Sequence, residues 1–465
     1  MTAQIPSAEV TPNKYSVGTL TYTRGKLVNV FFWMLWGDFC LNLMDSGVQP
    51  NVIPLQLKKY GASMSAIGFL TGTVVEIMSI VMVVIISTWS DRHRGPLGRR
   101  MPFMLYATPP LALCLIAMGF SPQIANWLQR TAPGTFAAIS MSSLVIGVIS
   151  VTMIGYKFFD MFPQSVYYYL FPDVIPAKLI GTFAALFRVC ATGGGLAFNY
   201  FLMKHAEDGP GMICLIAGVL YLVSFVVMAF MVKEGEYAPP DPAPSGPVLQ
   251  RFVATARKYA NECYSLKYYW KFYVFSICFW CGFGPFMRFL VFYGRDLTNG
   301  NLEQLGHINA LRDGLQMGAF FLVGPLVDKL HPLRSGIIGL ALTMIALLAS
   351  LLFIHDVGSF TICMIATFVA MALLQGSFAA LPARILPRQQ YGQFCSANSM
   401  LWHFCLMAAY PACGFAMQTF GNKIIFAWFL GFSTLGIIML YVLYLDWKRL
   451  GGDDHYTPPT PSESH

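Results

Sequence analysis

Charged residues are scarce in this chain. Lysine, arginine, aspartate and glutamate make up 11% of its 465 residues, whereas hydrophobic residues make up 56%. An ordinary soluble domain carries roughly 25% charged residues, and its helices alternate polar and apolar faces, which most segments of this chain do not. The shortage of charge therefore excludes a soluble globular protein and predicts a protein that crosses a membrane many times.

The motifs of several enzyme classes are also missing. The sequence has no Walker A phosphate loop, no His-Glu-x-x-His zinc motif and no Gly-x-Ser-x-Gly nucleophile motif. The glycine triplet at 193–195 lies inside an apolar segment and does not form a phosphate-binding loop. We therefore expect neither an enzyme nor an ATP-driven pump, and we expect no cofactor.

Long apolar runs fill most of the chain, and each is long enough to cross the hydrocarbon core of a bilayer. If the N-terminus is cytoplasmic, about 20 of the 30 lysines and arginines fall in cytoplasmic segments, as the positive-inside rule requires. The net charge of +8 follows this distribution, so we expect contact with lipid and not with nucleic acid. We predict an all-α membrane protein of twelve transmembrane helices with both termini cytoplasmic. The predicted helices are 27–49, 63–89, 102–120, 136–171, 182–203, 211–232, 271–294, 303–327, 335–354, 358–381, 392–417 and 422–446.

Composition divides the chain into five segments. We expect a cytoplasmic arm at 1–26, an N-terminal six-helix bundle at 27–232 and a C-terminal bundle at 271–446. Between them, the proline-rich linker at 233–270 ends in basic and aromatic residues, which indicate an amphipathic segment on the membrane surface or an ordinary solvated loop. The polar tail at 447–465 is expected to be disordered.

Two pairs of segments repeat between the halves. An acidic residue, a basic neighbour, a turn and further basic residues occur at 89–100 and again at 324–334. The segments 176–185 and 387–396 share the same Pro-to-Gly and Gly-to-Phe intervals. Two matches at equivalent places indicate a duplicated six-helix unit, which is the architecture of a carrier that rocks around a central site.

The residues at this point resemble a known family. The twelve spans, the central loop and the Asp91-Arg92…Gly98-Arg99-Arg100 loop are similar to those of the major facilitator superfamily. The fuller stretch at 90–103 resembles the loop of glycoside–pentoside–hexuronide:cation symporters and sucrose-transporter-like carriers, although the superfamily's usual glycine ahead of the first aspartate is absent. The resemblance implies two pseudo-symmetric six-helix bundles, the major facilitator fold, with cation-coupled sugar transport between them.

The repeated loops are candidate parts of a gate. Their charged side chains can pair with helix ends or with each other, and we expect them to latch the halves on the cytoplasmic side when the cavity faces outward. Simple anchoring of the loops by arginine is the alternative. The candidate gate residues are Asp91, Arg92, Gly98, Arg99, Arg100, Asp328, Lys329 and Arg334.

Polar residues at helical spacing mark candidate coupling groups in the first half. One stripe consists of Asp38, Asn42, Asp45 and Gln49, and a second of Lys157, Asp160 and Gln164. Steps of three and four place each stripe on one helix face, where it would border a wetted cavity or form an internal ion-pair network that only positions helices. Carboxylates in such a cavity take up H+ or bind Na+, so the coupling candidates are Asp160, Glu76, Asp38 and Asp45.

Further buried polar and aromatic residues are candidates for binding solute. Sugars stack on aromatic rings, although core filling is the commoner role of such rings. Arg312 and the adjacent Asp313 project about 100° apart on a helix, and His403 is expected at a helix interface. The candidates are Arg188, Lys157, Asn42, Asn199, Gln164, Arg312, Gln316, Gln375, Asn398 and Trp402.

Together these patterns predict a secondary active transporter that works by alternating access. We expect H+ or Na+ symport of a sugar, glycoside or similar polar organic solute, by a monomer in the inner (cytoplasmic) cell membrane. The alternative is a non-transporting assembly or pigment-delivery factor of the same superfamily. Buried charged stripes favour transport, because a pigment handler requires an apolar groove facing lipid.

Overall fold

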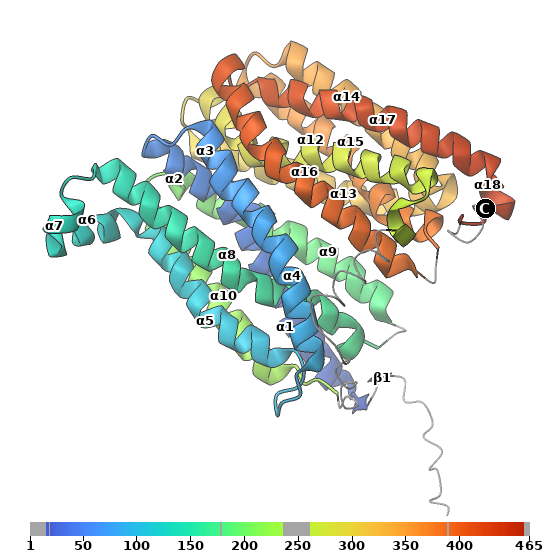
Figure 1. Cartoon of the computed structure of the whole chain (residues 1–465), viewed down its shortest axis with the longest axis horizontal. Coiled ribbons are helices and arrows are strands. Elements are labelled where there is room, and N and C mark those ends of the chain that lie inside the picture. Colours follow the sequence, from blue (N-terminus) through green and yellow to red (C-terminus); the bar gives the residue numbers. More distant parts are fainter. Residues whose placement is uncertain (1–14, 18, 177–178, 236–260, 388–389, 460–465) are drawn as a thin grey trace, which may run out of the picture.

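The computed structural model describes residues 15–17, 19–176, 179–235, 261–387 and 390–459. Within these residues the chain forms twelve long helical segments in two bundles of six (Figure 1). Ten of the segments are long and apolar enough to cross a membrane. The fifth and eighth segments complete the set and carry more polar residues, of which Asn199 of the fifth and Asp313 of the eighth meet across the two bundles. The predicted fold class, an all-α membrane protein with twelve transmembrane helices, is confirmed.

The N-terminal bundle follows a two-stranded hairpin, β1 (Ser16–Val17) and β2 (Leu20–Thr21). Its first two spans contain wide π-helical turns, and Pro50 lies within the first of them. Short helices α6 and α7 separate the third span from the fourth. The elements are α1 (Arg24–Asn42), η1 (Leu43–Val52), α2 (Ile53–Lys59), α3 (Met64–Gly68), η2 (Phe69–Thr73), α4 (Val74–Arg92), α5 (Met101–Gly119), α6 (Ser121–Thr131), α7 (Pro133–Phe136), α8 (Met141–Val174), α9 (Ile180–Ala197), η4 (Phe198–Leu202), η5 (Met203–His205) and α10 (Pro210–Met231).

The C-terminal bundle is more regular, with one continuous helix for each span. Side-chain caps define where several helices begin: Asn301 accepts a hydrogen bond from the Gln304 amide at 3.0 Å, and Asp356 forms a capping box with Ser359. The elements are α12 (Lys267–Leu297), α13 (Leu302–Leu330), α14 (Pro332–Phe353), α15 (Val357–Ile385), α16 (Tyr391–Phe420), α17 (Ile424–Arg449) and α18 (Gly452–His455).

The same helix pairs pack together in both bundles. In the first, α5 packs on α8 and α10, α1 on α9 and α10, and α4 on α8. In the second, α14 packs on α15 and α17, α12 on α16 and α17, and α13 on α15. Each pairing of the first six spans therefore has its counterpart in the last six, as a duplicated unit requires.

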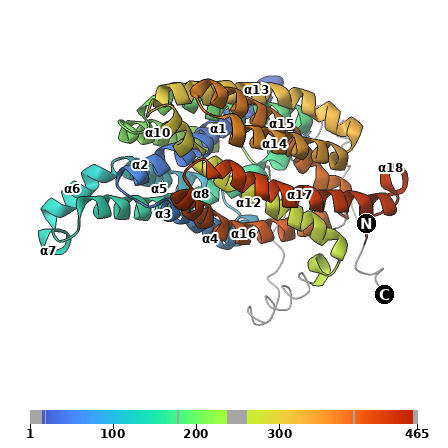
Figure 2. The same ribbon diagram turned by 90° about the horizontal axis from the view of Figure 1, so that it is seen from above.

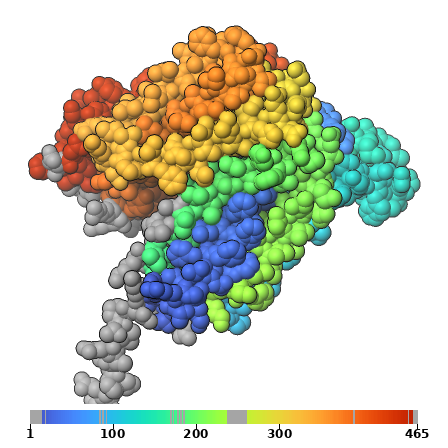
Figure 3. Space-filling view, turned by 180° about the vertical axis from the view of Figure 1, so that it is seen from behind, coloured from blue at the N-terminus to red at the C-terminus, as the bar shows by residue number. Residues whose placement is uncertain are grey.

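The two bundles touch mainly at one end. The start of the second span (α3 and η2) packs on the later part of α16, and the end of the fifth (η4 and η5) packs on the start of α13. Away from these crossings the bundles diverge toward the end that carries the loop between α4 and α5 (Figure 1). From behind, the green and yellow helices form the boundary between the halves (Figure 3). We call the packed end the closed end and the other the open end.

Three parts of the structure differ from the sequence-based expectation. Residues 121–136 form the two short helices α6 and α7, and the fourth span begins at Met141. The expected disordered tail is folded as far as Pro459: α17 runs to Arg449, and the Tyr456 hydroxyl donates to the carbonyl of Ile385 at 2.7 Å. An aromatic residue that finds a buried partner orders this segment despite its polar composition. Most of the predicted amphipathic segment lies outside the described residues, as do residues 1–14.

Candidate functional site

A buried ion cluster lies in the N-terminal bundle, between the first and fourth spans. The Lys157 ammonium is 2.9 Å from a carboxylate oxygen of Asp160 and 3.7 Å from one of Asp45. Lys157 and Asp160 are buried, whereas the Asp45 side chain is 30% exposed. The two residues share one face of α8, as their spacing predicts, and they form an i, i+3 ion pair there. Asp45 joins it from η1, so the ion pair also bridges two helices.

Amide and hydroxyl groups surround this cluster. Both oxygens of Asp45 accept hydrogen bonds, one from Gln49 in the same wide turn and the other from Gln164 on α8. Gln49 also donates to the Tyr156 hydroxyl at 3.1 Å. One face of the first span and one face of the fourth therefore meet, and Asp45 and Gln49 of the first stripe form a single polar network with the second stripe.

The Tyr221 hydroxyl completes the network from the sixth span. It donates to the second carboxylate oxygen of Asp160 at 3.5 Å. Sequence reasoning missed Tyr221, because an isolated tyrosine in an apolar span carries no periodic signal. Only the packing of α10 into the bundle brings it to the carboxylate.

Asp38 is buried beside the cluster but is not part of it. One oxygen accepts from the Asn42 amide at 2.9 Å, and the other has no hydrogen-bond partner among the described residues. The cation that acts electrostatically on Asp38 is Arg188. The exposed guanidinium of Arg188 lies 6.0 Å from the Phe320 ring of α13, at the boundary between the bundles. Asp38 therefore lies between the buried network and the inter-bundle boundary.

A second polar contact joins the bundles directly. Glu76 of α4 pairs with Nδ1 of His403 on α16. The adjacent Trp402 stacks on the His403 ring at 3.7 Å and on Trp280 of α12 at 4.7 Å. His403 lies at a helix interface, as predicted, but its partner could not be identified from sequence because 327 residues separate the two.

The eighth span carries the matching contact on the other side. Asn199 of η4 donates to Asp313 at 2.8 Å, across the bundle boundary. Arg312 forms hydrogen bonds of 2.7 and 2.9 Å with the same carboxylate, and its guanidinium lies 3.9 Å from the Phe368 ring. Adjacent residues on a helix diverge, but the long arginine side chain curls back to its neighbour. This pairing holds Arg312 in place.

The remaining solute candidates are dispersed within the C-terminal bundle. Gln316 of α13 and Gln375 of α15 face each other at 3.5 Å. Asn398 of α16 is buried, and its side-chain oxygen has no partner among the described residues. Arg288 of α12, which sequence reasoning did not select as a site residue, acts electrostatically on Lys157 and on Tyr410. It is therefore the cation of the second bundle that approaches the ion cluster of the first.

Close backbone crossings form the closed end. A Cβ atom added to Gly68 or Gly72 would overlap Tyr410, and one added to Gly414 would overlap the carbonyl of Met64. The α16 backbone also accepts a hydrogen bond across this crossing: the Thr73 hydroxyl donates to the carbonyl of Met407 at 2.6 Å. Glycine is required at these positions because the helix backbones approach closely.

The fifth and eighth spans form an equivalent crossing. A Cβ atom on Gly306 would overlap the carbonyl of Asn199. Near this crossing Arg295 pairs with Glu207, whose carbonyl accepts from Lys59 at 2.9 Å. These three residues lie outside the predicted spans: Lys59 ends α2, Arg295 is in the last turn of α12, and Glu207 is in the turn before α10. Together with the glycine crossings they hold the closed end together.

The predicted gate residues of the first half pair within that half. Arg99 and Arg100 lie 3.1 and 3.3 Å from Asp173 at the end of α8. The Glu234 carboxylate accepts from the backbone amides of both arginines, next to Gly98, whose φ of +100° favours glycine. Asp91 and Arg92 lie on α4, but their side chains are outside the described part of the structure.

The equivalent loop of the second half is anchored differently. Arg334 lies 2.6 Å from Asp453 on α18, and Asp328 and Lys329 are exposed. In this open arrangement the side chains of Arg99, Arg100 and Arg334 therefore pair within their own halves of the chain. The latch between halves in an outward-facing state remains a prediction.

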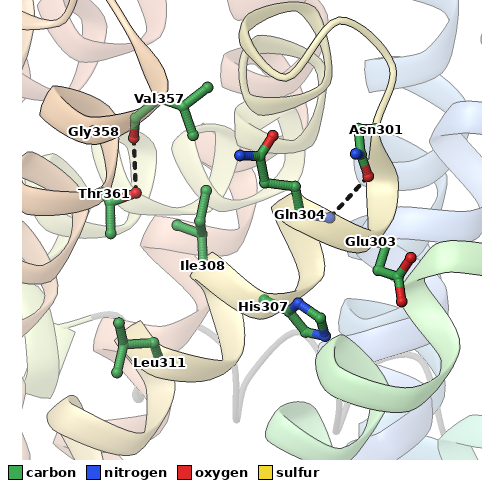
Figure 4. Close-up of a pocket in the computed structure, with 9 residues that line it drawn as sticks. All are labelled: Asn301, Glu303, Gln304, His307, Ile308, Leu311, Val357, Gly358 and Thr361. Atoms are coloured by element: carbon green, nitrogen blue, oxygen red, sulfur yellow. Dashed lines mark hydrogen bonds between the residues drawn. The ribbon is translucent and has the colours of Figure 1, made fainter.

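A groove at the closed end, between the starts of α13 and α15, is separate from these polar contacts (Figure 4). Glu303 and His307 lie on its α13 wall, and Thr361, which donates to the Val357 carbonyl at 2.7 Å, lies on the α15 wall. A smaller cavity between the bundles is lined by Asn51, Asn309 and Arg312, among other residues. Within the described residues, no group of three or more His, Cys, Asp or Glu side chains could hold a metal ion.

Two duplicated bundles around buried inter-bundle polar contacts define the class of protein as a polytopic membrane carrier. The chain matches the family model of the Major Facilitator Superfamily over residues 35–410 and belongs to that superfamily. No curated protein matches its sequence.

Solved transporters share its fold at low sequence identity. A point mutant of the nucleoside transporter NupG is 11% identical, with a TM-score of 0.66 over 89% of this chain and 100% of that one. A bacterial homologue of the iron transporter ferroportin in an inward-facing state is 14% identical, with a TM-score of 0.64 over 90% and 98%. The xylose transporter XylE from E. coli in an inward open conformation is 13% identical, with a TM-score of 0.62 over 94% and 98%.

Proposed function

We propose that this protein is a cation-coupled symporter of a sugar, glycoside or similar polar organic solute, working by alternating access. The observation that carries the proposal is the buried polar network of the N-terminal bundle together with a separate buried carboxylate, Asp38, beside the inter-bundle boundary. A charged group at the centre of a membrane helix costs about 2.5–3.5 kcal/mol on insertion scales. Several such groups in one bundle are therefore typical of a coupling or transport pathway.

Asp38 is the proposed proton carrier. A carboxylate buried with one amide partner and no adjacent ammonium is costly to keep ionised. Asp160 is less suited, because Lys157 neutralises it at 2.9 Å. Arg188 on the neighbouring helix provides a charge that attracts the ionised form of Asp38. Proton release from Asp38 toward the open end would then accompany release of solute.

The bundle boundary is the proposed solute site. Trp280 and Trp402 stack beside the Glu76–His403 pair, so an aromatic surface lies next to hydrogen-bonding groups. That combination suits a sugar, whose C–H face packs on rings while its hydroxyls bond to polar groups. The resemblance of the 90–103 loop to sugar:cation symporters supports the same class of solute.

The conformation is proposed to be inward-open. The basic loops at 93–100 and 331–334 lie at the open end, and the positive-inside rule places such loops in the cytoplasm. Both termini are then cytoplasmic, and the glycine crossings close the external side. We propose the inner membrane of a cell as the location and a monomer as the working unit.

Uptake into proteoliposomes tests the proposal. Purified protein is assayed with a panel of labelled sugars and glycosides under an imposed pH gradient, a Na+ gradient or neither. We expect accumulation under the pH gradient. Asp38→Asn should reduce accumulation at least about 10-fold while solute exchange without a gradient persists, because the amide keeps the hydrogen bond but carries no proton. Glu303→Gln, in the groove at the closed end, is the matched control.

Each contrary result has a meaning. Wild-type accumulation by Asp38→Asn removes Asp38 as the coupling group. Accumulation that occurs only under the Na+ gradient would identify Na+, and not H+, as the coupling ion. Absence of both exchange and accumulation for every solute in the panel favours the assembly-factor alternative.

A further inference from the structure

The third and fourth spans are joined by a helical arm. One residue, Phe120, separates the end of α5 from the start of α6; α7 follows α6, and α8 begins at Met141. Both short helices project beyond the rest of the N-terminal bundle at the closed end (Figures 1 and 2). The arm therefore connects the ends of two apolar spans and lies outside both of them.

The charge of this region is unusual for a water-exposed loop. Between Arg100 and Lys157 the sequence has one charged residue, Arg130, near the C-terminal end of α6. The Arg130 side chain is exposed and makes no ion pair with another described residue. A helix that lies on a membrane is typically apolar on one side and bears basic groups near the lipid phosphates.

Large apolar side chains of the arm are exposed. Trp127 on α6 is 61% exposed, and Ile139 and Met141, just before and at the start of α8, are 38% and 39% exposed. The α6 face turned toward the bundle instead carries the small buried residues Ser121 and Ala125, with the half-buried Leu128 packed on the same core. Tryptophan is enriched where an amphipathic ring can lie between hydrocarbon and headgroup. The exposed apolar atoms therefore suit lipid better than water.

The apolar surface continues into the spans. On α5 and α8 the side chains of Leu113 and Val151 are 68% and 71% exposed, as expected of positions that face acyl chains. Trp127, Ile139 and Met141 extend this surface at the closed end. A hydrogen bond of 2.9 Å from Gln129 to the Ile139 carbonyl ties the arm together, so its residues keep their positions.

We propose that α6 and α7 form an interfacial arm that rests in the lipid headgroup region, with Trp127 at the acyl boundary and Arg130 paired with a lipid phosphate. The partner is therefore the bilayer. The arm holds α5 and α8 at a constant depth, so that the N-terminal bundle is tethered to one leaflet while the C-terminal bundle moves against it.

Site-directed fluorescence tests the arm. Trp127→Cys is labelled with bimane and reconstituted in nanodiscs that contain either plain lipid or lipid with a nitroxide near the headgroup. Asn126→Cys, at an exposed position about 100° around the same helix, is the matched control, and wild type treated with the same bimane reagent gives the background of native cysteines. We expect nitroxide lipid to quench the label at 127 at least about threefold more than the label at 126, and aqueous iodide to show the reverse order.

Three outcomes would overturn the proposal. Equal access of iodide to both labels shows a solvated loop. Protection of the label at 127 from both quenchers shows a protein partner or a second copy of the chain over the arm. If the label itself disturbs α6, Ile139→Cys provides a second site with the same expected order, and the absence of lipid quenching at both sites rejects the arm.

Discussion

The two bundles repeat each other's helix packing but bury different charges. The first holds the three-membered cluster of Asp45, Lys157 and Asp160, whereas the second holds the adjacent pair Arg312 and Asp313. The first cluster bridges two helices, and the second lies within one. A duplicated fold therefore does not require duplicated chemistry, because packing depends on apolar surface and the ion pairs depend on a few separate substitutions.

Symmetry does persist where the bundles meet. Glu76 lies 15 residues before Asp91, and Asp313 lies 15 residues before Asp328, so the two carboxylates occupy equivalent positions in the repeat. Both reach across the bundle boundary, Glu76 to His403 and Asp313 to Asn199. The position is thus shared, while one contact joins a carboxylate to an imidazole and the other joins a carboxylate to an amide.

The largest effect is expected when the lysine of the N-terminal cluster is replaced. Lys157→Met leaves Asp160 and Asp45 without their shared cation, and breaking a buried pair in this way costs about 3–5 kcal/mol. Thermal unfolding of the purified variant measures the loss. Combining Lys157→Met with Asp160→Asn should recover most of it, because no uncompensated charge stays buried. An unchanged midpoint for Lys157→Met would show that the cluster contributes nothing to stability.

An intermediate effect is expected at the two crossings of the closed end. Gly306→Ala and Gly414→Ala each place a methyl group against a backbone carbonyl, and overpacking of this kind costs about 1–3 kcal/mol. The closed end should open more often, by about 5- to 150-fold in population. Each glycine substitution is made in a protein that also carries Asn309→Cys. The rate at which this cysteine reacts with a membrane-impermeant maleimide measures how often the closed end opens.

Matched alanines make that comparison specific. Gly318 on α13 and Gly392 on α16 have no neighbouring atom within 4 Å of an added Cβ, so Gly318→Ala and Gly392→Ala should leave maleimide reactivity at the wild-type level. Equal effects at 306 and 414 would support a symmetric closed end. A change in maleimide reactivity for only one of the two variants would show that this crossing alone keeps the closed end shut.

The smallest expected effect concerns the loops at the open end. His331 caps α14 by accepting from the Leu333 amide at 3.3 Å, at a φ of +68°, and its ring lies 4.4 Å from Trp447. Burial lowers the pKa of His331 from its usual 6.5 to about 4, with Arg384 and Arg334 acting in the same direction and Asp453 opposing them. The unfolded chain therefore binds more protons between pH 6.5 and 4.

Stability should accordingly fall as the pH drops from about 6.5 toward 4, and this contribution should be flat above 6.5. His331→Asn should reduce that slope, because asparagine also caps helices and tolerates positive φ but does not titrate. Unfolding midpoints of both proteins at several pH values measure the difference. An identical slope in the two proteins would assign the pH dependence to other groups.

Much of the architecture was predictable from the sequence. The predicted spans agree with the helices to within a few residues at most ends, because a run of about 20 apolar residues is a direct consequence of bilayer thickness. The Lys157–Asp160 pair could equally be predicted from the sequence, since i, i+3 neighbours meet in any helix. The helices α6 and α7 were missed because they are short and weakly periodic, and short helices depend on their tertiary surroundings.

The sequence by itself determined the membrane class, the twelve spans, the duplication and the local polar stripes. Hydropathy and helical period determine the spans and the stripes within single segments, and the duplication is visible when segments of the two halves are compared. Only the tertiary structure decided that Asp45 joins Lys157, that Glu76 meets His403 and Asp313 meets Asn199, and that one end of the molecule is closed. Such partners depend on how helices rotate and cross, and that arrangement comes from packing between segments far apart in the chain.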